Sequence, residues 1–304
     1  MRKIELKVTP KERRLDQFLA AKVKSLSRSQ IKKLIHEENI KVNSQPTTSD
    51  HKPTRGDVIT LEIPLPRTTE VRPENIPLKI VYEDKGILVI DKEAGLVTHP
   101  TLDHPSGTLV NAVLFYLKSV PGSGESLRPG IVHRLDKGTS GLIVVAKNEK
   151  SLESLKKQFK ERSVVKKYTC LVQGRVEKTF GSIDAPIGRH VVNRKKFAVD
   201  KEGREAMTKY SLISHVGEKF DLLEAAPKTG RTHQIRVHLS HIGHPIVGDR
   251  LYGGKALGRR QFLHASYLEF THPKTGIRIH FESKLPPDLQ IIFDRLGERN
   301  QQNP

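Results

Sequence analysis

An aspartate and an arginine stand between two short apolar runs in the middle of the chain. Ile131-Val132 and residues 142–146 have the composition of buried strands, and Arg134 and Asp136 lie in the segment between them. A loop held by buried strands is a common place for catalytic groups. Asp136 can serve there as a catalytic carboxylate, or as a turn residue, because the sequence Asp-Lys-Gly suits a tight turn. The residues alone leave both interpretations open.

A second polar stretch contains Arg231 just before a helical pattern. Ile235 and Leu239 recur at helical spacing, and Thr232 is a suitable N-cap, so Arg231 is expected on a turn where this helix begins. Four histidines accompany it: His233, His238, His241 and His244. A zinc site would require acidic or thiolate ligands at set spacing, and none is adjacent in the sequence. We therefore predict no metal site.

Residues 166–172 alternate between polar and apolar side chains and predict a strand that carries Tyr168. By its position alone, Tyr168 would be read as a core tyrosine. Cys170 is the only cysteine of the chain, which excludes an intramolecular disulfide and a multi-cysteine zinc site.

The composition indicates a polyanionic partner. The 304 residues carry a formal net charge of +19 with a pI near 9.9, of which residues 1–64 contribute +6 and the remainder +13. Nucleic acid is therefore expected as the partner rather than a membrane. No apolar run approaches the roughly 20 residues of a membrane span, and the N-terminus lacks the apolar core of a signal peptide. A cytoplasmic location is the expectation.

Two helical patterns open the chain. Residues 14–23 carry apolar side chains at helical spacing, and Ser27 is a suitable N-cap for a second helix. That helix would display three basic side chains as a stripe: Arg28, Lys32 and Lys33. Short strands are expected at 39–43 and 57–63. The stripe suits RNA binding, and it also suits an ordinary charged helix face.

The remaining chain divides by composition into a linker, a large domain and a tail. Four prolines without apolar periodicity mark residues 64–77 as a semi-rigid linker after a domain of residues 1–63. Residues 78–296 contain the strand and helix patterns of a larger domain. Residues 297–304 are polar and are expected to be disordered.

Three motifs of the larger domain resemble those of the RluA-type pseudouridine synthases. His133-Arg134-Leu135-Asp136-x-x-Thr139-Ser140-Gly141-Leu142 resembles the catalytic motif of that family, and residues 229–249 resemble its third motif. Residues 87–92 and 95–100 together resemble the first motif, although Glu93 replaces its usual proline. Residues 13–63 are similar to an S4-type RNA-binding domain, which points to the RluD-like subgroup that acts on large-subunit rRNA.

The resemblance implies an α+β fold with a mixed or antiparallel central β-sheet and a small S4-like αα-β domain before it. It also implies roles for individual residues: Asp136 as the catalytic carboxylate, Arg231 as its pairing partner and Tyr168 as a ring that stacks on the target base. If Arg231 does not pair with Asp136, Arg236 of the same motif is the arginine to test. Arg134 would fill the space that the flipped base leaves or contact the displaced stack, unless it only forms a salt bridge with a neighbouring acid. Arg28, Lys32 and Lys33 would contact RNA.

The implied reaction is the isomerisation of uridine to pseudouridine in RNA, most simply 23S-type rRNA or a ribosomal precursor. It requires no cofactor, and a monomer is expected. One carboxylate suffices, and whether Asp136 attacks the ribose or removes a proton from it stays open. The alternatives are a non-catalytic RNA-binding ribosome-assembly factor and an RNA nuclease, the latter disfavoured because clustered acids for a metal are missing.

Overall fold

The protein was analysed as a computed structural model that describes residues 2–8, 14–23, 26–63, 71–101, 104–118, 130–194 and 196–298. The chain divides into two compact units, Met1–Thr69 and Glu70–Pro304. Each unit encloses its own hydrophobic core, so neither depends on the other for burial of its apolar side chains. None of the described helices is long and apolar enough to cross a membrane.

Unit 1 packs two helices against one antiparallel sheet of strand order β1-β4-β2-β3. Its elements are β1 (Arg2–Lys7), α1 (Leu15–Lys22), α2 (Arg28–His36), β2 (Ile40–Val42), β3 (Gln45–Pro46) and β4 (Val58–Ile63). Ser27 caps α2 as predicted, in a capping box with Gln30. The sequence prediction missed β1, which pairs with β4 along its whole length and extends the sheet to Arg2.

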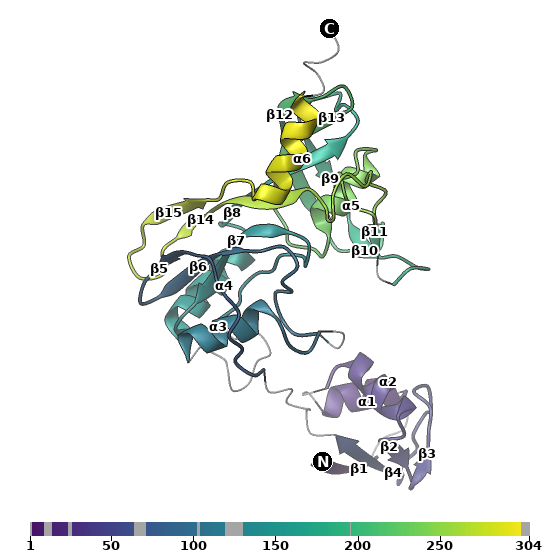
Figure 1. The fold of residues 1–304 in the computed structure, drawn as a ribbon. Coiled ribbons are helices and arrows are strands. Elements are labelled where there is room, and N and C mark those ends of the chain that lie inside the picture. Colours follow the sequence, from purple (N-terminus) through teal and green to yellow (C-terminus); the bar gives the residue numbers. More distant parts are fainter. Residues whose placement is uncertain are drawn as a thin grey trace. The chain divides into compact units, whose positions relative to one another are not determined.

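Unit 2 is an α+β domain, as predicted, built on a mixed sheet. Among the described residues nine strands join in the order β5-β6-β7-β14-β8-β13-β12-β9, with β15 beside β14 (Figure 1). The strands of this sheet are β5 (Ile80–Glu83), β6 (Ile87–Lys92), β7 (Ser140–Ala146), β8 (Val165–Gln173), β9 (Phe180–Asp184), β12 (Met207–Val216), β13 (Phe220–Pro227), β14 (Leu263–Thr271) and β15 (Arg278–Glu282). A separate hairpin pairs β10 (Ile187–Arg189) with β11 (Phe197–Val199).

Strands β6 and β7 are buried throughout because helices cover both of their faces. The helices of unit 2 are α3 (Leu109–Leu117), α4 (Glu149–Lys160), α5 (Gln234–His241) and α6 (Pro287–Glu298). Ile87 and Val89 of β6 pack into the cluster that includes α4, whereas Leu88 and Ile90 pack against α3. This alternation is the two-residue period of a strand. The loop of Asp136 therefore leads into a strand that is fixed from both sides.

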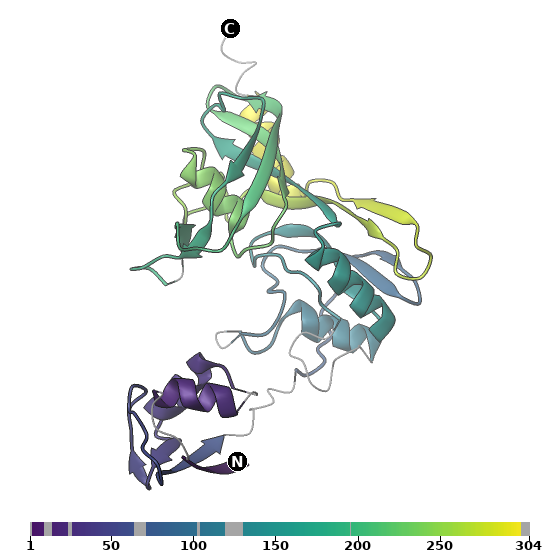
Figure 2. The same cartoon turned by 180° about the vertical axis from the view of Figure 1, so that it is seen from behind.

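The other end of the sheet carries the largest core. Side chains of β8 and β13 pack with Ile235 and Leu239 of α5 and with Leu289 of α6. Figures 1 and 2 show α6 lying along β12 and β13, with α5 close to β10 and β11. Helix α5 is thus held by strands that precede it in the chain, β11, β12 and β13.

The sheet has two halves, β5-β6-β7 and the strands from β14 to β9, and a short parallel pairing between β7 and β14 joins them. Ser140 pairs with His264 and Gly141 with Ala265. Gly141 has φ of +112°, and a Cβ there would lie 2.3 Å from the carbonyl oxygen of Ala265. Only glycine allows this approach without moving the strands. We call this contact the seam.

Three local predictions differ from the structure. Ile131-Val132 is not a strand; Ile131 forms an isolated bridge with Val145. Residues 71–77 of the predicted linker are fixed to unit 2, because the Asn111 amide donates to the Arg72 carbonyl and the Glu74 carboxylate accepts from the Gly107 amide. Helix α6 includes Gly297 and Glu298, which the prediction assigned to the tail. Residues 64–70 and 299–304 lie outside the described residues.

Candidate active site

Asp136 lies on a loop that three neighbouring backbone contacts hold in place. The Thr98 hydroxyl donates to the Leu135 carbonyl at 2.7 Å, and the Gly95 amide donates to the Lys137 carbonyl at 2.7 Å. On the other side, the Val144 amide of β7 donates to His133 Nε2 at 3.0 Å. The carboxylate is therefore presented by a loop with little freedom, which suits a reacting group.

The carboxylate of Asp136 is paired with Arg236, not with Arg231. Arg236 Nη1 donates to Asp136 Oδ2 at 3.0 Å, and Arg236 Nε and Nη2 bind the two oxygens of Asp249 at 2.6 and 2.9 Å. His233 Nε2 lies 3.9 Å from the same Asp136 oxygen. The charges and hydrogen bonds of both aspartates raise the pKa of Arg236 although burial alone would lower it. The guanidinium of Arg236 therefore stays charged and holds the Asp136 carboxylate in one orientation.

The predicted pairing of Arg231 with Asp136 is wrong for a conformational reason. Helix α5 begins at Gln234, with His233 as its N-cap in the left-handed region at φ +57°, and Thr232 does not cap it. Arg236 consequently stands in the first turn and faces Asp136. Arg231 lies before the turn, and its Nε donates to the Glu205 carbonyl at 3.0 Å. It still lines the cavity.

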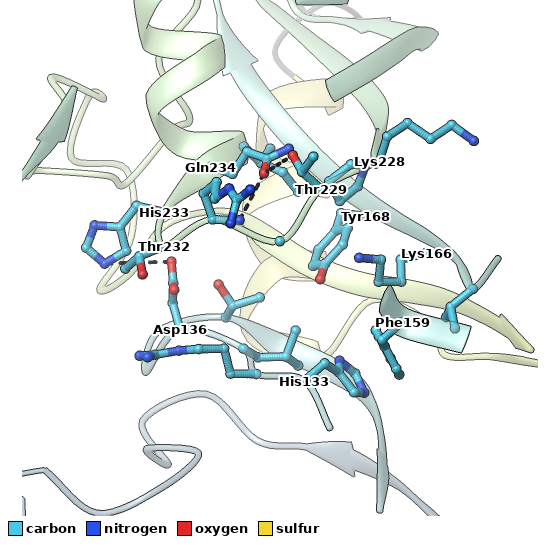
Figure 3. Close-up of a pocket in the computed structure, with 18 of the residues that line it drawn as sticks. His133, Asp136, Phe159, Lys166, Tyr168, Lys228, Thr229, Thr232, His233 and Gln234 are labelled. Carbon is cyan, nitrogen blue, oxygen red and sulfur yellow. Dashed lines mark hydrogen bonds and ion pairs between the residues drawn. The ribbon is translucent and has the colours of Figure 1, made fainter. Parts of the chain in front are cut away.

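Asp136 opens onto a cavity of about 510 Å³ that also receives Tyr168 of β8. In Figure 3 the Tyr168 ring lies between Asp136 and His233 on one side and Lys166 and Phe159 on the other. Burial, followed by the charge of Asp136, raises the pKa of Tyr168, so its hydroxyl stays protonated. The apolar lining, which the sequence did not identify, comprises Ile131, Val132, Leu135, Phe159, Val164, Ile235 and Leu263. An aromatic face over an apolar floor suits a flat, uncharged ring.

The rim of the cavity is basic. Its cationic side chains are Arg134, Lys160, Arg162, Lys166, Lys228 and Arg231. Arg134 is exposed, with Nη1 3.4 Å from His99 Nε2. Burial, with a smaller contribution from the charge of Lys228, lowers the pKa of Lys166 to about 8. No ion pair joins Lys166 to a carboxylate among the described residues. Such a rim suits a phosphate backbone around a neutral base.

The described residues contain no group of three histidine, cysteine, aspartate or glutamate side chains that could hold a metal ion. His238 is accounted for as a buried structural residue. Its two ring nitrogens lie 2.9 Å from the Thr208 hydroxyl and 2.9 Å from the Ala185 carbonyl.

Two family models match the chain. Residues 86–241 match RNA pseudouridylate synthase, and residues 13–59 match the S4 domain. The first match covers the loop of Asp136, Tyr168 and all of α5. The chain belongs to the RNA pseudouridylate synthase family. Membership of this family makes the chain an RNA pseudouridine synthase. The alternative of a non-catalytic RNA-binding ribosome-assembly factor therefore loses its main support.

Relatives of the same length agree with this family. An uncharacterized RNA pseudouridine synthase of Aquifex aeolicus is 44% identical over 98% of both chains. The ribosomal large subunit pseudouridine synthase D of Pseudomonas aeruginosa is 42% identical over 94% of this chain and 92% of that protein. Among solved structures, human RNA pseudouridylate synthase domain containing 1 is 27% identical over 79% of this chain and 98% of that chain, with a TM-score of 0.58.

In the S4 unit the three predicted basic side chains differ in their surroundings. Arg28 Nη2 and Lys32 Nζ lie 2.8 and 3.8 Å from Asp16 Oδ2, and Asp16 is fully buried. Lys33 instead approaches Glu37, the C-cap of the same helix. The hydrogen bond from Arg28 lowers the pKa of Asp16 against the effect of burial. The guanidinium of Arg28 is thus held in one direction, and its role in RNA binding stays a prediction.

Two functional candidates escaped the sequence analysis, His233 and Lys92, and Arg236 entered it only as the arginine to test if Arg231 should not pair with Asp136. Arg236 was detectable as a second arginine in the third motif. His233 was considered only as a metal ligand. Lys92 is 1% exposed and donates to the carbonyls of Glu93 and Leu96, so it braces the turn that holds the Asp136 loop. No local pattern distinguishes a lysine of this kind from a surface lysine.

Proposed function

We propose that this enzyme converts specific uridines of large-subunit ribosomal RNA to pseudouridine, with Asp136 as the group that acts on the ribose. The observation that carries the proposal is the single carboxylate held by Arg236 at one wall of an apolar cavity with a basic rim. The RNA class is supported by the name of the Pseudomonas aeruginosa relative. The proposal includes a cytoplasmic monomer that needs no cofactor, with rRNA or a ribosomal precursor as its partner.

In the proposed reaction a uridine leaves the RNA stack and enters the cavity. Its base lies against the Tyr168 ring, and its ribose lies at Asp136. The bond from C1′ to N1 breaks, the uracil turns, and a bond forms from C1′ to C5. C5 then loses its proton and N1 gains one, so the atoms balance without an oxidant or reductant. Asp136 either attacks C1′ or removes the proton at C2′, and both roles need the ionised carboxylate that Arg236 orients.

The RNA contacts of the proposal come from both units. Arg134 stands at the rim, where it can occupy the place of the flipped base, and Arg231 and Lys166 line the same cavity. Arg28, Lys32 and Lys33 of the S4 unit would bind phosphates away from the target. Charge of this kind supplies affinity without sequence specificity, so the choice of uridine is made by RNA shape and by the cavity.

The test is pseudouridine mapping of rRNA from cells with and without the gene, joined to an assay with purified protein. Tritium release from C5-labelled rRNA measures the reaction directly. Asp136→Asn should bind RNA normally and lose activity by roughly three orders of magnitude or more. Asp294→Asn, on the exposed side of α6, is the matched control. If Asp136→Asn keeps activity within about tenfold of the parent, the catalytic assignment is wrong.

The same variant separates the enzyme from an assembly factor. An enzyme predicts that rRNA from cells with Asp136→Asn lacks the pseudouridines that the parent makes. If the parent and the null strain have identical pseudouridine maps while Asp136→Asn restores ribosome assembly, the protein acts by binding alone.

A further inference from the structure

Tyr252 contacts three parts of unit 2: His233 at the N-cap of α5, helix α5 itself, and the hairpin of β10 and β11. Its hydroxyl accepts from the Phe197 amide of β11 at 3.0 Å and lies 2.9 Å from His233 Nδ1. Its ring lies beneath the guanidinium of Arg236, 5.0 Å from the ring centre. Its carbonyl accepts from the Ser240 hydroxyl of α5 at 2.9 Å. One side chain thus contacts both groups that face Asp136.

His233 depends on this contact for its orientation. The residue has a left-handed backbone, which a residue with a side chain adopts only when its surroundings impose it. Its ring meets the rings of Phe197 and Tyr252 edge-on, at 5.8 and 5.7 Å. The hydroxyl of Tyr252 engages Nδ1, which leaves Nε2 directed at Asp136 (Figure 3). Without the hydroxyl, aromatic contacts alone would set the angle of the imidazole.

The third part is the hairpin of β10 and β11, which we call the basic hairpin. Its described residues include Arg189, His190 and Arg194, and Val191 and Val192 at its tip are 92% and 87% exposed. The Arg189 guanidinium lies 5.6 Å from the centre of the Phe197 ring. Exposed cations beside apolar side chains are typical of a surface that meets RNA. The Phe197 amide is the point where this hairpin touches Tyr252.

We propose that Tyr252 is a positioning residue for the uridine isomerisation: its hydroxyl holds His233 against Asp136 and joins this pair to the basic hairpin. The proposal rests on the proposed function for the reaction, but the contact itself is independent of it. Tyr252 acts through His233 and touches neither the base nor the ribose. If Tyr252 only filled space, removing its hydroxyl would leave the reaction rate unchanged.

The decisive variant is Tyr252→Phe in the full-length protein, which keeps the ring beneath Arg236 and removes only the hydroxyl contacts. The single-turnover rate at saturating rRNA should fall roughly tenfold, the upper range for loss of one hydrogen bond, while the RNA Kd stays within about twofold. Tyr116→Phe is the matched control, because its hydroxyl bonds Glu83 on the surface of unit 2. A rate within about twofold of the parent overturns the proposal. So does an unchanged rate with weakened RNA binding.

A double-mutant cycle tests whether the hydroxyl acts through His233. The double variant Tyr252→Phe/His233→Gln should react no more slowly than His233→Gln alone, because in this proposal the hydroxyl affects the rate only through His233. Losses that multiply overturn the proposal.

Histidine ¹⁵N NMR provides a readout that does not depend on activity, with the His233 signal assigned through His233→Gln. Tyr252→Phe should shift the Nδ1 resonance of His233. If the parent forms no pseudouridine and the resonance shifts, the proposed function fails and the hold on His233 stands. An unchanged resonance overturns the Tyr252 proposal whether or not the parent is active.

Discussion

At the scale of single residues, Arg236 is shared between two carboxylates of different kinds. Asp136 opens onto the cavity with a side chain that is 16% exposed, whereas Asp249 is 1% exposed. The bidentate pair with Asp249 fixes the plane of the guanidinium, and the remaining Nη1 is then directed at Asp136. The cavity-facing carboxylate is thus oriented by a second carboxylate that never meets the substrate.

Arg236→Lys should separate charge from geometry. A lysine keeps the positive charge but has no planar fork to bind Asp249 and Asp136 together. We expect kcat to fall by roughly two orders of magnitude, the effect of a misplaced reacting group, with the protein still folded. Arg231→Lys, at the rim, is the comparison and should change KM more than kcat. Tritium-release kinetics decide, and a larger loss of kcat in Arg231→Lys would restore the original pairing.

Lys166 should make RNA binding sensitive to pH. With its pKa lowered to about 8, the ammonium is charged below that pH and neutral above it in the free protein. A cation at the rim attracts phosphate, so affinity should fall as pH rises through about 8. Lys166→Arg stays charged and should lose this step. Fluorescence anisotropy at constant ionic strength measures it, and identical pH profiles for the two proteins would contradict the assignment.

At the scale of elements, the turn after β6 supports the catalytic loop through a buried lysine. Burial lowers the pKa of Lys92 to about 7, against the opposing charge of Asp136. Between about pH 7 and the usual lysine value of about 10.4, the unfolded chain binds a proton there that the folded chain does not. The contribution of Lys92 to the free energy of unfolding therefore rises with pH across that range. As the pH falls back to about 7, this contribution is lost.

Lys92→Met should remove that dependence. The difference in unfolding free energy between parent and variant should rise with pH by up to about 1.4 kcal/mol per unit in this window. Urea unfolding at a series of pH values measures the difference. Lys85→Met, in the turn before β6, controls for the loss of one lysine elsewhere. A difference that is flat with pH would show that Lys92 is protonated in the folded protein.

Much of the fold could be predicted because each strand and helix carries its own periodic pattern. Residues 87–90 and 142–146 are continuous apolar runs, and the structure buries them on both faces. Strand β1 was missed although Ile4 and Leu6 alternate with polar residues, because its neighbour β4 is more than fifty positions away. A strand of six residues is decided by the partner it pairs with, which local pattern does not contain.

The site was predictable only in part for a related reason. Asp136 and Tyr168 stand in motifs, and the structure brings both to one cavity. The choice between Arg231 and Arg236 depends on the left-handed backbone of His233, which sets where α5 begins. A left-handed backbone is uncommon for any residue other than glycine, and although histidine is among the residues enriched there, the sequence does not show which of the chain's histidines adopts it. Contacts such as that of Tyr252 with Phe197 join residues 55 positions apart and are invisible to spacing.

At the scale of the whole molecule, the S4 unit should contribute affinity without contributing to the core of unit 2. A protein that begins at Glu70 keeps every side chain of the larger cores. We expect it to fold, to bind rRNA more weakly and to depend less on salt. Each lost phosphate contact should reduce the log–log slope by about 0.7 to 0.9. Circular dichroism and binding at several salt concentrations test this, and an unchanged slope would deny the S4 unit an RNA role.

The seam has a consequence for how this protein tolerates genetic change. Asp136 belongs to the strands on one side of it, and Tyr168 and Arg236 belong to the other side. A methyl group at Gly141 would push against the Ala265 backbone and part the two halves of the cavity. In a library scored by growth, Gly141 would tolerate as few replacements as Asp136 itself. Gly141, which carries no functional group, would then appear to be a catalytic residue. The solubility of the variants would distinguish the two positions, because replacements at Gly141 disturb the fold whereas replacements at Asp136 do not.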